Sequence, residues 1–174
     1  MKQPIGVFPA GTVLVKHFDL PLDLGNPKIT RRLETRFIVC LPYGRKYGVT
    51  YRWNDAQTEA TLLEQGETGT YEVIQSNGAA LQQTWQFPSR SDCISCHNDA
   101  SGQALGVRTH QLHTPSSFGG DSSKSNQLTI WNNLKMFNHA LSESLIENTL
   151  RSAGLEDETY PLEHRVRSYL DSNC

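Results

Sequence analysis

Long apolar runs, methionine and cysteine are all scarce in this chain of 174 residues. No run reaches the roughly 18 apolar residues that a membrane-spanning helix needs, so the sequence predicts no membrane span. Sixteen basic and 18 acidic side chains leave a net charge of −2, which excludes the strongly basic surface typical of nucleic-acid-binding proteins. The length and the hydrophobic content of 37% allow one domain or two small ones.

One short motif carries most of the chemistry that the sequence predicts. Residues 93–97 read Cys-Ile-Ser-Cys-His, the C-x-x-C-H pattern that attaches c-type haem. Two thiols at this spacing can form thioether bonds with the two vinyl groups of one porphyrin, and the adjacent imidazole can bind the iron as its proximal ligand. We therefore predict one covalent haem c, held by Cys93, Cys96 and His97.

Two other kinds of site share a C-x-x-C pair. A structural zinc site needs four ligands, and His110 and His113 can complete Cys93 and Cys96. A thioredoxin-like dithiol usually lies where a strand leads into a helix, whereas residues 87–92 read as a turn. The histidine directly after Cys96 favours haem over both alternatives.

The first residues lack the apolar segment of an export signal. Haem c is normally attached after export, so we expect this sequence to be part of a longer periplasmic or secreted protein. In an oxidising compartment the two cysteines outside the motif, Cys40 and Cys174, can form a disulfide.

Residues 1–88 have the alternating pattern of β-strands. Stretches rich in β-branched and aromatic residues predict strands near 11–18, 32–40, 47–53, 61–63, 70–74 and 81–87. Asn77 and Gly78 predict a hairpin between the last two strands. One predicted strand face combines Tyr47, Val49, Tyr51 and Trp53, which we expect to form either core or a wall that shields one edge of the haem.

Residues 89–174 have a different composition. A loop rich in Gly, Ser and Asn over 98–125, with a short helical turn near 103–112, precedes apolar residues at helical spacing, which predict helices over 126–141, 142–153 and 161–170. The predicted fold class is α+β. An N-terminal antiparallel sheet or small sandwich over 1–88 packs on a mainly α-helical, cytochrome c-like haem half over 89–174, and together they form one unit.

The iron of an electron-transfer haem usually has a second axial ligand from the protein. Met136 is the first candidate, because it is the only methionine besides Met1, and His110 or His113 is the alternative. At helical spacing Met136 points away from the apolar stripe, so it suits a ligand if the helix unwinds near 135–138 or buries two faces. Arg90, Arg108 and Trp131 are candidate partners for the haem propionates; they can equally be surface residues or, for Trp131, core.

Several segments resemble a family of secreted bacterial cytochrome c modules, often fused to PQQ-dependent sugar dehydrogenase-like or carbohydrate-binding domains. The resemblance lies in residues 85–97 (WQFPSRSDCISCH), 105–109 (LGVRT) and 126–128 (NQL), and in the β-rich stretches 11–16, 31–36 and 51–58. In that family the segment matching 167–174 runs on into a second C-x-x-C-H. The resemblance thus implies that Cys174 begins a second haem site, of which this chain lacks the rest.

The resemblance implies an electron carrier rather than an enzyme. Its haem would pass single electrons to or from a redox partner protein or a fused dehydrogenase domain, in an oxidoreductase acting on carbohydrate. Two alternatives stay open: a five-coordinate haem enzyme or sensor of the peroxidase kind, and a haem-free carbohydrate-binding module whose cysteines hold zinc or a disulfide.

Overall fold

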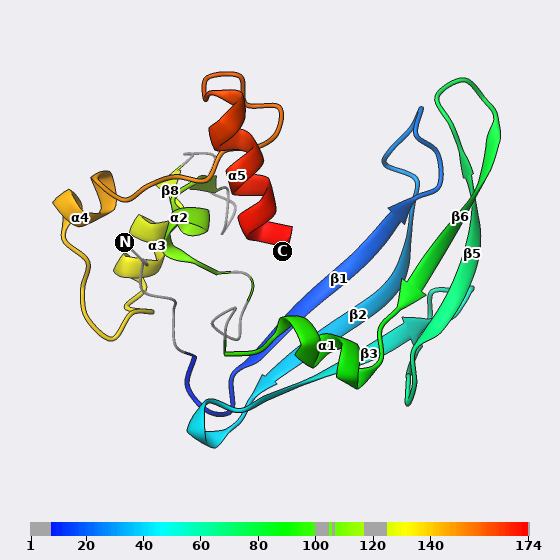
Figure 1. Cartoon of the computed structure of the whole chain (residues 1–174), viewed down its shortest axis with the longest axis horizontal. Coiled ribbons are helices and arrows are strands. Elements are labelled where there is room, and N and C mark those ends of the chain that lie inside the picture. The colour runs from blue at the N-terminus through cyan, green and yellow to red at the C-terminus, as the bar shows by residue number, and fades with distance from the viewer. Residues whose placement is uncertain (1–7, 100–104, 106, 117–124, 174) are drawn as a thin grey trace. The chain divides into compact units, whose positions relative to one another are not determined.

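The computed structural model describes residues 8–99, 105, 107–116 and 125–173 (Figure 1). Contacts within the chain divide it into two compact units. The first, here called the β unit, is Phe8–Asp99, and the second, the C-terminal unit, takes in the described residues from 105 onward. The β unit extends past the predicted strands as far as Asp99 and therefore contains the C-x-x-C-H motif.

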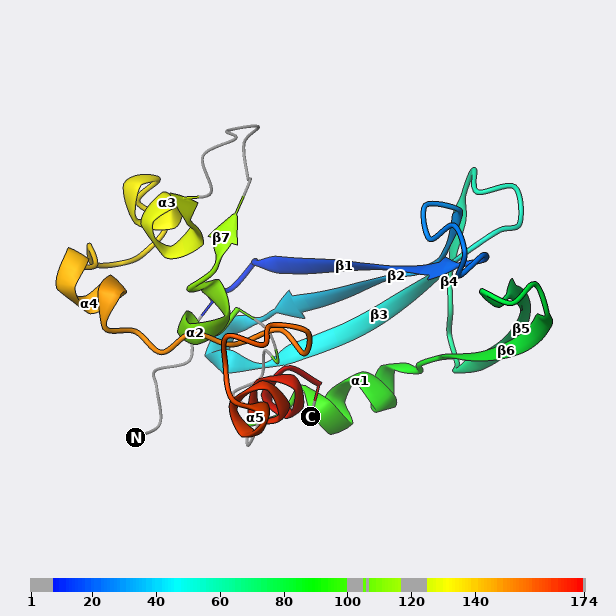
Figure 2. The ribbon, with the colours of Figure 1, turned by 90° about the horizontal axis from the view of Figure 1, so that it is seen from above.

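The β unit is built on a four-stranded antiparallel sheet, with a two-stranded antiparallel ribbon beside it (Figures 1 and 2). The sheet has the order β1 (Val13–Pro21), β2 (Thr30–Cys40), β3 (Lys46–Trp53), β4 (Ala60–Leu62), and the ribbon pairs β5 (Glu67–Ile74) with β6 (Ala80–Phe87). A single turn of 3₁₀ helix, Pro42–Gly44, joins β2 to β3. Gly78 in the ribbon turn has a φ of 83°, which a side chain would strain. The predicted strands, their antiparallel pairing and the hairpin are confirmed.

Alternation gives β2 and β3 two different faces. The first, here called the motif face, carries the paired residues Glu34–Arg52, Arg36–Thr50 and Ile38–Gly48. A bulge in β2, opposite Phe18 and Asp19, inserts Leu33 beside Glu34. Both residues are buried, and Leu33 forms a core cluster with Leu63 and Phe87.

The opposite face, here called the aromatic face, is not the core of the β unit. It carries Tyr47, Val49, Tyr51 and Trp53, as the alternation predicted. Tyr47 is 41% exposed, and Val13 and Val15 of the neighbouring β1 are 46% and 52% exposed. The expectation that this face forms core is therefore wrong, because the apolar core lies at the bulge instead.

The C-terminal unit consists of short elements around a small core. They are α2 (Thr109–Leu112), β7 (Pro115–Ser116), β8 (Ser125–Asn126), α3 (Gln127–Asn133), α4 (Glu143–Glu147) and α5 (Leu162–Asn173). The core cluster is Leu112, Leu128 and Ile146. The prediction of a mainly α-helical, cytochrome c-like half is wrong: the structure is sheet-rich, with 34% strand and 25% helix, and its helices are few and short.

Contacts to distant parts of the chain end α3 and α4 earlier than apolar spacing predicts. Asn132 Nδ2 donates to the carbonyl of Leu141 (2.9 Å) and Asn132 Oδ1 accepts from its N–H (2.7 Å), which closes residues 134–141 into a loop. Lys135 in that loop has a φ of 55°. After α4 the N–H of Ser152 donates to the carbonyl of His110 at 2.9 Å, so the backbone bonds outside its own segment. Among the described residues, the helices are all too short or too polar to cross a membrane.

Candidate haem-attachment site

The motif lies on a helix that begins directly after the ribbon. Helix α1 (Arg90–Cys96) starts with a capping box in which the Asp92 N–H donates to Ser89 Oγ (3.2 Å) and the Ser89 N–H donates to Asp92 Oδ2 (2.9 Å). The Ser89 hydroxyl also donates to Asp92, and this bond, with that from the Ser89 N–H, lowers the Asp92 pKa. Reading residues 87–92 as a plain turn was therefore wrong. A serine three residues before an aspartate was the missed signal.

The two cysteines lie one helical turn apart on α1. Residues three positions apart are neighbours on a helix surface, so Cys93 and Cys96 share one side of α1. His97 is the C-cap, and its N–H donates to the carbonyl of Cys93 at 2.9 Å. The Cys96 side chain is exposed and that of His97 is partly buried. The motif thus combines two thiols and an imidazole at the end of one short helix.

Gly48 on the motif face is where Cys93 packs against the sheet. A Cβ atom added at Gly48 would lie 2.5 Å from Cys93 Cβ and 2.8 Å from Cys93 Sγ, so any larger residue would push α1 away from β3. Figures 1 and 2 both show α1 alongside β3. Cys93 is only 8% exposed, and burial raises the pKa of its thiol.

This geometry differs from that of a reactive dithiol. Reactive thiols have a lowered pKa, often through a helix N-terminus. Cys93 is the fourth residue of α1 and Cys96 the last, and the Cys93 pKa is raised instead. The described cysteines, Cys40, Cys93 and Cys96, form no disulfide. The predicted bridge from Cys40 to Cys174 involves a residue outside the described ones.

The zinc alternative finds no ligand cluster in the part of the chain that the structure describes. There, no group of three or more His, Cys, Asp or Glu side chains is placed to hold a metal ion. The two histidines that could complete such a site make other contacts. His113 Nδ1 donates to the carbonyl of Thr149 at 2.7 Å, and His110 Nε2 donates to Asp171 Oδ2 at 2.7 Å.

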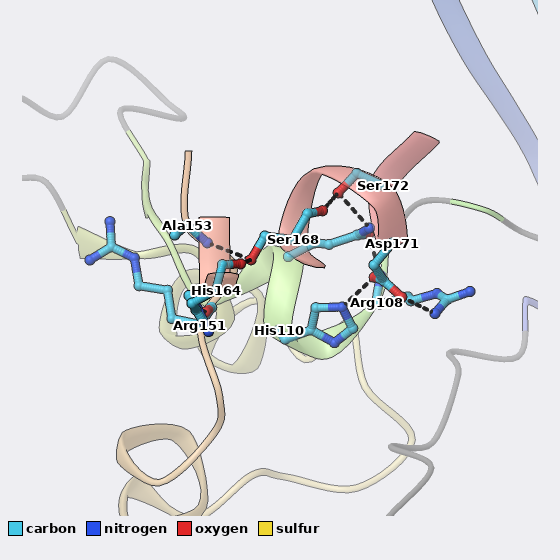
Figure 3. A network of polar contacts seen from close by, with 9 residues as sticks. Arg108, His110, Arg151, Ala153, His164, Ser168, Asp171 and Ser172 are labelled. Carbon is cyan, nitrogen blue, oxygen red and sulfur yellow. Dashed lines mark hydrogen bonds and ion pairs between the residues drawn. The ribbon is translucent and has the colours of Figure 1, made fainter. Parts of the chain in front are cut away.

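His110 belongs to a polar network that holds α5 (Figure 3). Asp171 of α5 accepts from His110 and, through Oδ1, from Arg108 Nη1 at 2.6 Å. Further along the helix, the Ser168 hydroxyl accepts from the N–H of Ala153 at 3.1 Å. Arg108, a predicted propionate partner, therefore has a carboxylate partner within its own unit.

The other candidate residues lie in varied surroundings. Met136 is 58% exposed and lies beyond the end of α3, so the helix does unwind there, as a ligand role for Met136 required. Trp131 packs against the core of the C-terminal unit, with its ring 6.3 Å from that of Phe137. Arg90 is exposed on α1, and its guanidinium lies 3.8 Å from the carboxylate of Glu64.

The candidate residues divide between the two units. Cys93, Cys96, His97 and Arg90 belong to α1 or its C-cap, in the β unit. The remaining candidates belong to the C-terminal unit: Arg108, His110, His113, Trp131 and Met136. Sequence reasoning missed Gly48, although a glycine inside a predicted strand is a signal of close backbone approach.

Comparison with known proteins found no match. No protein-family model matches the chain, and neither the curated proteins nor the solved structures contain a significant relative.

Proposed function

We propose that this chain is an electron-transfer module that carries one covalently attached haem c. In this proposal it accepts single electrons from one redox protein and passes them to another, one of the two being linked to carbohydrate oxidation. The observation that supports it is the arrangement on α1, where Cys93 and Cys96 lie one turn apart and His97 follows directly. This donor set fits a covalent haem better than zinc, because two thiols and one imidazole are enough to attach haem and bind its iron on one side, whereas a structural zinc needs four ligands.

When bound, haem supplies an iron that changes its charge by one electron. The residues of this chain would hold and orient it. Cys93 and Cys96 would provide the two sulfurs, and His97 the proximal imidazole. The capping box at Ser89 and the close packing on Gly48 fix α1 at both its start and its middle, so the attachment residues lie on a rigid support. Arg90 on the same helix is the propionate partner we propose in this unit.

Met136, His113 and His110 are the candidates for the second axial ligand. Met136 lies on an exposed loop, and its thioether needs no rearrangement of a core to bind iron. His113 is the alternative ligand, and its hydrogen bond suits that role. Because Nδ1 donates to the carbonyl of Thr149, Nε2 keeps its lone pair, which is how metal-binding histidines are commonly oriented. His110 as a ligand would compete with its bond to Asp171.

A visible spectrum of the exported protein tests this function. The chain would be produced with an export signal and haem-attachment machinery, then reduced chemically and exposed to carbon monoxide. An electron carrier is expected to give a sharp low-spin reduced spectrum that carbon monoxide does not change. A high-spin spectrum that responds to carbon monoxide would support the five-coordinate enzyme or sensor, and a folded colourless protein would contradict both.

Separate Met136→Ala, His110→Ala and His113→Ala variants would identify the second ligand. The variant that lacks the ligand is expected to become high-spin and to bind carbon monoxide, while the other two keep the parent spectrum. His139→Ala is a matched control, because His139 is an exposed histidine of the same unit.

A further inference from the structure

A fully buried carboxylate, Glu34, pairs with a partly exposed arginine, Arg36, on the motif face, against which α1 packs. Glu34 is fully buried, and its Oε1 accepts from Arg36 Nη2 and, at 3.0 Å, from Trp85 Nε1. Among the described residues, Glu34 Oε2, Arg36 Nε and the Thr50 hydroxyl are buried without a hydrogen-bond partner. Burying a carboxylate and leaving buried polar atoms unpaired both cost stability.

Glu34 and Arg36 lie on β2, which pairs with β3, the strand whose Gly48 contacts Cys93. Arg36 is opposite Thr50, and Gly48, against which Cys93 packs, is two residues further along β3. At the strand rise of about 3.3 Å per residue, Gly48 is roughly 7 Å from the Arg36 pair and roughly 13 Å from the Glu34 pair. After burial, three side-chain charges act on the Cys93 pKa: the guanidinium of Arg36 lowers it, and the carboxylates of Asp92 and then Glu34 raise it.

We propose that Glu34 and Arg36 form an internal charge pair that sets the reduction potential of the haem attached at Cys93 and Cys96. This inference rests on the proposed function. Reduction adds one electron to the iron centre, so a nearby positive charge stabilises the reduced form and a nearby negative charge stabilises the oxidised form. Because Glu34 is fully buried, its charge is screened less than that of a surface carboxylate, whereas the Arg36 side chain is 30% exposed.

Potentiometric titration of haem-loaded variants tests the proposal. Glu34→Gln removes the negative charge and is expected to raise the midpoint potential, whereas Arg36→Gln is expected to lower it. With an effective dielectric constant of about 20, a unit charge about 12 Å from the iron alters the reduction equilibrium constant about tenfold, or about 59 mV for a one-electron couple, and a closer charge alters it more. Arg36→Lys keeps the charge and is expected to stay close to the parent potential.

Matched controls come from an exposed ion pair on the same sheet. Arg32 Nε and Asp19 Oδ1 are 2.9 Å apart, with side chains 37% and 38% exposed, so water screens both charges. Asp19→Asn is expected to move the potential far less than Glu34→Gln, because Glu34 is buried and Asp19 is not. Arg32→Gln is expected to move it less than Arg36→Gln, because Arg32 lies beyond Glu34 along β2, further from Gly48. Shifts of opposite sign for Glu34→Gln and Arg36→Gln, each beyond these controls, would support the proposal.

The outcomes separate this inference from the proposed function. If the parent protein carries haem and neither Glu34→Gln nor Arg36→Gln moves the potential beyond the controls, the charge-pair proposal is overturned and the electron carrier stands. If Arg36→Lys shifts the potential as much as Arg36→Gln, structure rather than charge is responsible, and the proposal fails. Should Glu34→Gln not fold, the contrast between Arg36→Gln and Arg36→Lys decides. A parent protein without haem overturns both proposals.

Discussion

The β unit and the C-terminal unit are each stabilised by a different kind of internal interaction. In the β unit, long strands share continuous backbone ladders, such as the pairing of Glu34–Cys40 with Lys46–Arg52. In the C-terminal unit, α2, α3 and α4 have only four to seven residues, and individual polar side chains join them to distant backbone, as Asn132 joins Leu141. A ladder repeats the same backbone hydrogen bond many times, whereas in the C-terminal unit a single side-chain hydrogen bond can fix the conformation of a loop.

The largest expected effects come from emptying the core of one unit at a time. Phe87 in the β unit and Leu128 in the C-terminal unit are 2% and 1% exposed. Phe87→Ala should lower stability by about 3–5 kcal/mol and Leu128→Ala by about 2–5 kcal/mol, because each leaves a cavity. Hydrogen exchange followed by peptide mass spectrometry should show the loss of protection concentrated in the mutated unit. An equal loss of protection in both units for both variants would contradict the division of the chain into two units.

A second substitution tests whether packing against the sheet positions the motif helix α1. Gly48→Ala places a methyl group against Cys93 and should destabilise the β unit by about 1–3 kcal/mol through overpacking. We also expect Cys93 in the haem-free protein to react faster with iodoacetamide, because α1 is pushed away from β3. Gly154→Ala is the matched control, since a Cβ there meets nothing within 4 Å. Unchanged Cys93 reactivity in Gly48→Ala would contradict the packing described here.

A third change tests the polar network of the C-terminal unit. Asp171→Asn weakens the contacts to Arg108 and His110 and should lower the stability of that unit by about 1–2 kcal/mol, given that Asp171 is one-third exposed. Glu163→Gln on the same helix removes an exposed pair with Arg167 and should have an effect of about 0.3–0.5 kcal/mol. Thermal unfolding of the two variants gives the comparison, and equal effects would mean that the network contributes no more than a surface pair.

The smallest expected effect is a pH dependence at the start of α1. The Asp92 pKa is lowered in the folded state, so its cap stabilises the helix at neutral pH, and this stability is lost as the pH falls through the lowered pKa. Amide exchange in α1 should therefore rise, relative to other helices, at acidic pH. Asp92→Asn should remove that pH dependence, whereas an acid-induced rise that persists in the variant would show that Asp92 is not its source.

The same contrast explains what could be predicted from the sequence. Alternation within residues 32–40 and 47–53 located β2 and β3 and the side chains of the aromatic face of β3. The bulge at Leu33 was not predictable, because it depends on the register with β1 rather than on β2 alone. In the C-terminal unit the apolar spacing over 126–141 fits a long helix. The neighbouring sequence does not indicate that the Asn132 side chain instead hydrogen-bonds the backbone of Leu141 and ends the helix.

The candidate site divides in a similar way. The motif itself predicts Cys93, Cys96 and His97 as the attachment residues, because their chemistry depends on spacing along the chain. Glu34 and Arg36 could not be found, since they approach the motif only through strand pairing and packing. Arg108 and His110 have the residue types expected around haem, but a distant residue, Asp171, is their partner in the fold.

The most direct test of the central claim is the intact mass of the exported protein after denaturation. The account predicts the mass of the chain plus one haem, retained in denaturant, with a single haem-bearing peptide that contains both Cys93 and Cys96. Cys40→Ala should keep this added mass, whereas Cys93→Ala with Cys96→Ala should lose it. A parent protein with the mass of the bare chain, with its two motif thiols free, bridged to each other or bound to zinc, would contradict the account.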